Sequence, residues 1–143
     1  MNRDSGVLHQ TPMRTLYALW TIAGGCLAAA VFVPGWEPSL AIATLGDDLQ
    51  VGLGAVMAAG GATCLVGATR WRVISTAWAV ERSGLILSTV AWGSYTVASI
   101  GLSGIDAVFE WGAAAGAVVL CAVRFAVVAR RDTMMTRIVQ GGQ

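Results

Sequence analysis

Residues 49–68 read LQVGLGAVMAAGGATCLVGA, and this stretch contains no charged side chain. A run of about 18 or more uncharged, mostly apolar residues is long enough to cross the hydrocarbon core of a bilayer as a helix. The whole chain has a matching composition, because 56% of its 143 residues are apolar and only 12% are charged, against roughly 25% charged residues in a soluble domain. The sequence therefore predicts an integral membrane protein.

Three further stretches are also mostly apolar, although the last contains Glu110 and Arg124, and breaker residues such as Pro34-Gly35 separate the stretches. The expected spans cover residues 16–33, 49–68, 83–102 and 107–129. We expect the segment 71–82, ahead of the third span, to be a cytoplasmic helical extension. Strands are excluded because no span shows period-two alternation and lipid does not tolerate unpaired strand edges. The predicted fold is all-α, a single domain over 1–143 with four transmembrane helices in two antiparallel hairpins.

The distribution of charge predicts the orientation of these helices. All nine basic residues are arginines, and they lie in the N-terminal tail, between the second and third spans, or towards the C-terminal end. In the other two connections all charged residues are acidic, among them Asp47, Asp48 and Asp106. Basic residues accumulate on the cytoplasmic side of a membrane. We therefore expect the protein in a bacterial inner membrane, with both termini on the cytoplasmic side.

Small residues in the second and fourth spans predict close helix packing. Gly54, Ala58 and Gly61 lie in the second span, and Gly112 and Gly116 lie in the fourth. Such residues let helix backbones approach closely in lipid, where dispersion replaces the hydrophobic effect. Two interpretations stay open, namely packing inside one four-helix bundle and association between subunits. Either way, we expect these two spans to be central or self-associating.

Glu81 and Arg124 are the predicted intramembrane charge pair. If the third and fourth spans turn near Ser103, the two residues lie about 22 and 21 residues from the turn, and therefore at similar depth. An ion pair would offset the cost of placing each charge in the membrane. In the alternative interpretation, Glu81 pairs locally or reaches the headgroups together with Arg82.

A second polar pair is possible at the outer end. By the same count Glu110 lies at the depth of Tyr95, and a hydrogen bond between them is geometrically possible, although Glu110 could also face outer water. Trp92 shares a helix face with Tyr95 and either lines a polar contact or fills the bundle. The other aromatic residues near span ends are expected at headgroup level: Tyr17, Trp20, Trp36, Trp71, Trp78 and Trp111.

The chain lacks the motifs of common catalytic sites. Cys26, Cys64 and Cys121 are isolated, each within an expected span, so thiol–disulfide exchange has no C-x-x-C pair and the cysteines are expected to be small buried apolar residues. His9 is the single histidine, and no nucleotide-binding or protease motif occurs. We therefore expect no enzyme activity, no catalytic residue, no cofactor, no metal and no nucleic-acid partner. The expected partners are the lipid bilayer and either a second copy or another membrane protein.

The stretch Glu81-Arg82-Ser83-Gly84-Leu85, followed by Ala91-Trp92 and Tyr95, resembles small four-helix membrane proteins of phages and prophages of actinobacteria. The use of Arg without Lys is typical of a GC-rich genome. The resemblance implies one of two functions. Holins assemble in the host membrane and release a lysin, whereas exclusion proteins block entry by a second phage.

Three classes of function are therefore expected. A holin-like, self-assembling protein is favoured by the Gly/Ala-rich spans and the lack of a catalytic set. A superinfection-exclusion or immunity protein would bind a membrane partner through loop residues such as Trp36 and Glu37. A small four-helix transporter is the third class, but the small multidrug family depends on an acidic residue in its first span, and 16–33 contains none.

Overall fold

The structure is a computed structural model, and it describes residues 11–33, 35, 46–69, 74–104 and 108–141. These residues form α2 (Thr11–Ala30), α4 (Asp47–Thr69), α5 (Ile74–Ser103) and α6 (Val108–Gly141), and none of them lies in a strand. The predicted all-helical fold is therefore confirmed for this part of the chain. Its helical segments long and apolar enough to cross a membrane are Asp47–Thr69, Thr76–Leu102 and Trp111–Arg131.

The first helix ends earlier than predicted. We expected a span up to Val33, but α2 ends at Ala30, and α2 is not one of the three helices that meet the membrane-crossing criterion. The amides of Phe32 and Val33 donate to the carbonyls of Ala29 and Ala30, three residues back, so the chain tightens into a turn. The residue after Val33 is Pro34. A proline disfavours helical backbone at the residue before it, and this explains why the helix does not continue to Val33.

The last two helices are longer than the predicted spans. Helix α5 runs unbroken from Ile74, so the described part of the 71–82 segment is the beginning of the spanning helix, and its apolar stretch already starts at Thr76. Helix α6 continues to Gly141, past Arg130-Arg131, where we expected its end. Arginine is a good helix former, and a pair of charges limits the membrane-crossing part without breaking the helix.

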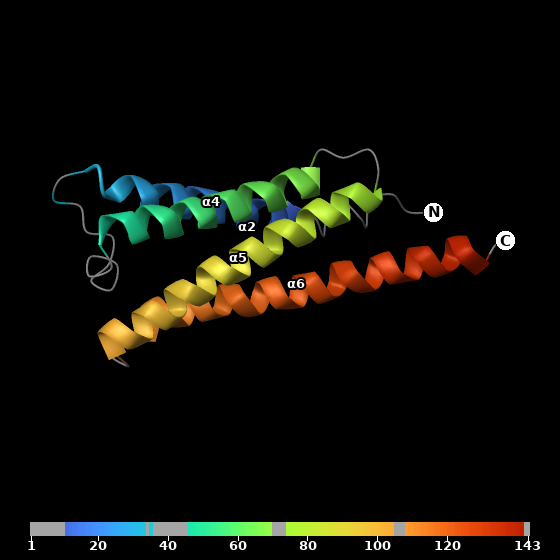
Figure 1. Ribbon diagram of the computed structural model, residues 1–143. Helices are drawn as coiled ribbons and strands as arrows, with labels where there is room; N and C mark the ends of the chain where they lie inside the picture. Colours follow the sequence, from blue (N-terminus) through green and yellow to red (C-terminus); the bar gives the residue numbers. More distant parts are fainter. Residues whose placement is uncertain (1–10, 34, 36–45, 70–73, 105–107, 142–143) are drawn as a thin grey trace.

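The helices form an open row, not a closed bundle. Successive helices run in opposite directions, and α2 begins at the end of the molecule where α6 finishes (Figure 1). Among the described helices, each backbone packs only against the next in the chain, α2 on α4, α4 on α5 and α5 on α6. Helices α4 and α5 are therefore central among the described helices. Of the two alternatives for the fourth span, central or self-associating, only self-association stays open as a prediction. The two predicted hairpins are not separate units, because α4 packs against both α2 and α5.

Glycines in α4 allow the close contact with α2. A Cβ atom placed on Gly54 would lie 2.5 Å from the amide nitrogen of Ala28 and 2.7 Å from the carbonyl oxygen of Gly24. One placed on Gly61 would lie 2.7 Å from the amide nitrogen of Thr21. Ala58 lies at the same contact, because its backbone nitrogen is the nearest atom to a Cβ on Gly24. The predicted packing residues of the second span thus all contact α2.

The predicted packing residues of the fourth span behave differently. A Cβ atom on Gly112 or Gly116 would meet nothing within 4 Å. Within one chain, these two glycines do not mediate helix packing. Instead, α6 contacts α5 and the core through another face, which buries Ala117 and Cys121.

The core is made of side chains from all four helices. Tyr17 and Trp20 are only 0% and 6% exposed, so both rings pack inside the protein, and their expected position at headgroup level stays a prediction. Their rings form a line of aromatic contacts with Trp92 and Tyr95. The distance between ring centroids is 5.8 Å for Tyr17–Trp20, 6.3 Å for Trp20–Trp92 and 6.2 Å for Trp92–Tyr95. Trp92 and Tyr95 therefore take part in packing between the helices, and a polar contact of Tyr95 stays a prediction. The main cluster consists of Tyr17, Trp20, Cys64, Leu85, Ala117 and Cys121.

Candidate functional site

Glu81 is an acidic side chain buried inside the helix row. Its exposed fraction is only 3%, and it lies five residues beyond Thr76, the start of the apolar stretch of α5, or about 8 Å along the helix. Helix α4 covers it closely because a glycine faces it. A Cβ atom on Gly67 would lie 2.7 Å from the Glu81 amide nitrogen. A buried carboxylate at this depth is costly unless other groups compensate its charge.

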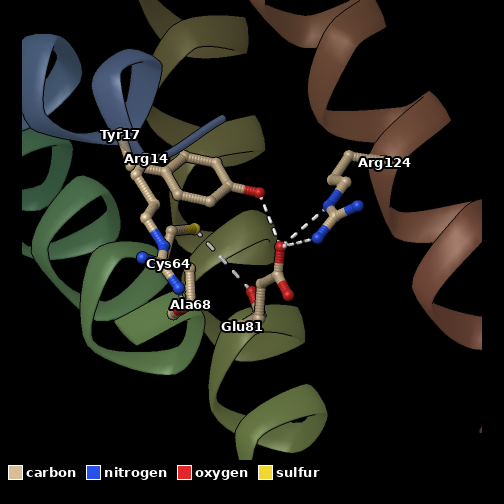
Figure 2. Close-up of polar contacts among 6 residues, drawn as sticks. All are labelled: Arg14, Tyr17, Cys64, Ala68, Glu81 and Arg124. Atoms are coloured by element: carbon tan, nitrogen blue, oxygen red, sulfur yellow. Dashed lines mark hydrogen bonds and ion pairs between the residues drawn. The ribbon is translucent and has the colours of Figure 1, made fainter. Parts of the chain in front are cut away.

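Arg124 of α6 supplies that compensation. Its Nε donates to Glu81 Oε1 at 2.8 Å, and its Nη2 forms an ion pair with the same oxygen at 2.8 Å (Figure 2). The structure thus brings together the two residues that the helix count placed at similar depth. Charge-assisted bonds of this kind are about twice as strong as bonds between neutral groups.

Tyr17 of α2 completes the set of donors. Its hydroxyl donates to Glu81 Oε1 at 2.7 Å, and the bond is buried (Figure 2). Helix α4 contributes Cys64, whose thiol donates weakly to the Glu81 backbone carbonyl at 3.7 Å. Side chains from three other helices therefore meet at Glu81, although the backbones of α2 and α6 do not pack against each other.

Sequence reasoning missed Tyr17 as a member of this site. The residue lies three positions after Arg14, on the same face of α2, and near the end of the molecule where the arginines gather. That spacing is a usable signal for a polar face. The role of Tyr17 was not predicted, because an aromatic residue near the end of a span is most simply interpreted as an anchor at the headgroups.

A polar pocket of about 340 Å³ opens beside the charge pair. Four charged residues line it, three of them arginines, and two of these, Arg14 and Arg131, were used above only to predict orientation. Arg14 also donates from Nη2 to the carbonyl of Ala68 at 2.9 Å (Figure 2), which satisfies a backbone acceptor in the last turn of α4. The lining includes Arg14, Ala68, Trp78, Glu81, Arg124 and Arg131.

The predicted outer pair is not assembled by the described residues. The Tyr95 ring is half-buried and meets the Trp92 ring edge-on, at 81°. The side chain of Glu110 lies outside the described residues, so its hydrogen bond with Tyr95 stays a prediction. The interaction that the structure shows for the described Tyr95 side chain is this aromatic contact.

The remaining chemistry-bearing side chains do not gather into a second site. Cys64 and Cys121 are buried, whereas Cys26 is exposed, contrary to the expectation that all three are buried, and all three are free thiols. Within the described ranges, no three His, Cys, Asp or Glu side chains come together. The chemistry of the site is therefore that of a paired carboxylate and a basic pocket, which can hold helices together and bind an anion.

Comparisons of the chain with protein-family models, with curated proteins and with solved structures found no match. The class that the fold defines is therefore an all-helical protein in which three of the described helices are long and apolar enough to span a membrane.

Proposed function

We propose that this chain is a small, non-enzymatic membrane protein that self-assembles in the bacterial inner membrane and acts in the manner of a phage holin. In this proposal all four helices cross the membrane and both termini face the cytoplasm. The observation that carries it is the open face of α6. Among the described helices this one packs against α5 alone, and no described atom lies within 4 Å of a Cβ position on its Gly112 or Gly116.

The positions of glycines in the other helices support the proposal that a second copy of the chain packs against the open face of α6. In α2, α4 and α5 this chain repeatedly joins helices where a glycine lets two backbones meet, as at Gly54 and Gly61. On α6 the same kind of surface continues as an apolar stripe of exposed valines, Val119, Val123 and Val127. Small residues followed by β-branched ones form a surface suited to close helix association in lipid.

The direct test is expression from an inducible promoter in a bacterial host, with growth, membrane potential and cross-linked oligomers measured together. The wild-type chain should form a ladder of oligomers and then collapse the membrane potential. Gly116→Leu should reduce both effects, because filling the contact costs about 1–3 kcal/mol, which is roughly 5- to 150-fold in association.

The matched control is Gly101→Leu on α5, another glycine with nothing within 4 Å. It makes the same change on a different helix and should leave the oligomers intact. An oligomer ladder unchanged by Gly116→Leu would exclude the α6 face. Normal growth and potential combined with resistance to phage challenge would replace the holin-like function with exclusion.

A further inference from the structure

Among the described residues that line it, the pocket beside Glu81 has more basic than acidic side chains. Arg124 offsets the charge of Glu81 directly through the 2.8 Å ion pair. Arg14 and Arg131 also line the pocket, so these lining residues include three arginines and one glutamate. The self-assembly proposed above makes no use of this charge, because the pocket lies between the helices of one chain.

The arginines reach the pocket from both edges of the helix row. Arg14 is near the start of α2, whereas Arg124 and Arg131 are on α6, seven residues apart and so on one face of that helix. Their guanidinium groups are planar and offer several N–H donors, a geometry that matches the oxygens of a phosphate. The Trp78 side chain adds an apolar wall to the lining.

The pocket also lies where membrane-crossing stretches end. Arg131 ends the membrane-crossing stretch of α6, and Thr69, which ends that of α4, lines the same pocket. Basic pockets between transmembrane helices on the cytoplasmic side are suited to anionic headgroups. We propose that this pocket is a binding site for a phosphate group, carried by an anionic lipid or free in solution.

Adjacent arginines on α6 provide a matched test. Arg131 lines this pocket, whereas Arg130 lines a separate hollow with Thr133, Met134 and Arg137. Both are exposed, so each can be replaced without breaking the Glu81–Arg124 pair. Binding of short-chain phosphatidylglycerol, diacylglycerol and inorganic phosphate to the full chain in neutral detergent would be measured by native mass spectrometry and calorimetry.

Phosphatidylglycerol should bind and diacylglycerol, which lacks the phosphate, should not. Arg131→Gln should weaken that binding about fivefold, the factor expected for one basic residue, whereas Arg130→Gln should change it less than about twofold. Arg131→Lys keeps the charge and should retain most of the binding, which separates loss of charge from loss of fold.

Inorganic phosphate distinguishes the two sources. If it binds with the same dependence on Arg131, the phosphate can come from solution, and if only phosphatidylglycerol binds, the source is the lipid headgroup. Absence of binding by both compounds would overturn the proposal, as would equal losses in Arg130→Gln and Arg131→Gln, which would indicate general surface attraction. Oligomer formation does not enter these measurements, so this result is independent of the test of self-assembly.

Discussion

At the residue scale, the balance of charge around Glu81 decides whether it can stay buried. One of its oxygens, Oε1, accepts from Tyr17 and Arg124, with donor distances of 2.7 and 2.8 Å. A buried, unpaired carboxylate costs several kcal/mol. The fold can therefore bury Glu81 only because these donors compensate its charge. Arg124 depends less on the pair, since its side chain is 19% exposed whereas that of Glu81 is 4% exposed.

The charge pair can be tested by a double-mutant cycle. Glu81→Gln and Arg124→Gln should each lower the free energy of unfolding, by roughly 3–5 kcal/mol for a fully buried pair. The loss should be larger for Arg124→Gln, because it leaves the more deeply buried charge unpaired. The double variant should recover part of the loss, since neither amide leaves a charge without a partner. Unfolding in detergent, followed by circular dichroism, gives the four free energies.

Two outcomes would contradict this prediction. Strictly additive losses in the double variant would mean that the two side chains do not interact in the membrane. Single variants as stable as the wild-type chain would mean that Glu81 reaches water at the headgroups, as in the alternative with Arg82.

At the scale of the helices, the spacing of glycines decides which faces meet. Helix α4 presents Gly54 and Gly61 to α2 and packs against α5 on another side. Its Gly52 has nothing within 4 Å. Glycines of one helix are therefore not equivalent, and the sequence alone does not separate them, because all lie in the same uncharged stretch.

This difference predicts the outcome of a matched pair of variants. Gly54→Ala should lower the free energy of unfolding by about 1–3 kcal/mol, because its Cβ would overlap the backbone of α2 at Ala28. Gly52→Ala should be neutral or slightly stabilising, since alanine is the better helix former. Thermal unfolding of both variants in the same detergent checks the prediction. Equal losses in the two variants would mean that α2 does not approach α4 at Gly54.

At the scale of the whole molecule, the open row brings the arginine-bearing helix ends to one side. Helix α2 begins and α6 ends there (Figure 1), and Arg14 and Arg131 line one pocket. The positive-inside rule predicts that this side faces the cytoplasm. Among the described helices, the open row also leaves α6 with α5 as its one neighbour, which is what the proposed self-assembly requires.

Reporter fusions test this orientation. A reporter fused at Gln143, or inserted between α4 and α5 at residues 70–73, should be active in the cytoplasm. A reporter placed at Ser39 or Gly104 should be active outside, because those connections lack basic residues. Paired reporters that are active only in the cytoplasm or only outside provide the measurement. An outside signal at Gln143 would mean that the chain crosses the membrane an odd number of times.

The sequence by itself determined the helical class and the approximate extent of the helices. Long uncharged stretches and helix-breaking residues are local properties, so α4 was predicted within two residues at its start and one at its end. The depth of Glu81 and Arg124 was also predictable, because rise per residue converts sequence distance into height along a hairpin. The helix ends that differ are Ala30 and Gly141. Pro34 disfavours helix before the uncharged stretch is complete, and Arg130-Arg131 limits the apolar stretch of α6 without ending the helix.

Only the tertiary structure decided which faces meet. Helices that are apolar all round have no polar side to indicate their rotation, so the open face at Gly112 and Gly116 could not be inferred from the sequence, and the spacing from Arg14 was the one signal for the burial of Tyr17. The same reason left the fourth span with two alternatives, central or self-associating. Rotation and neighbours are set by the close approach of backbones at particular glycines, and that approach depends on all the helices together.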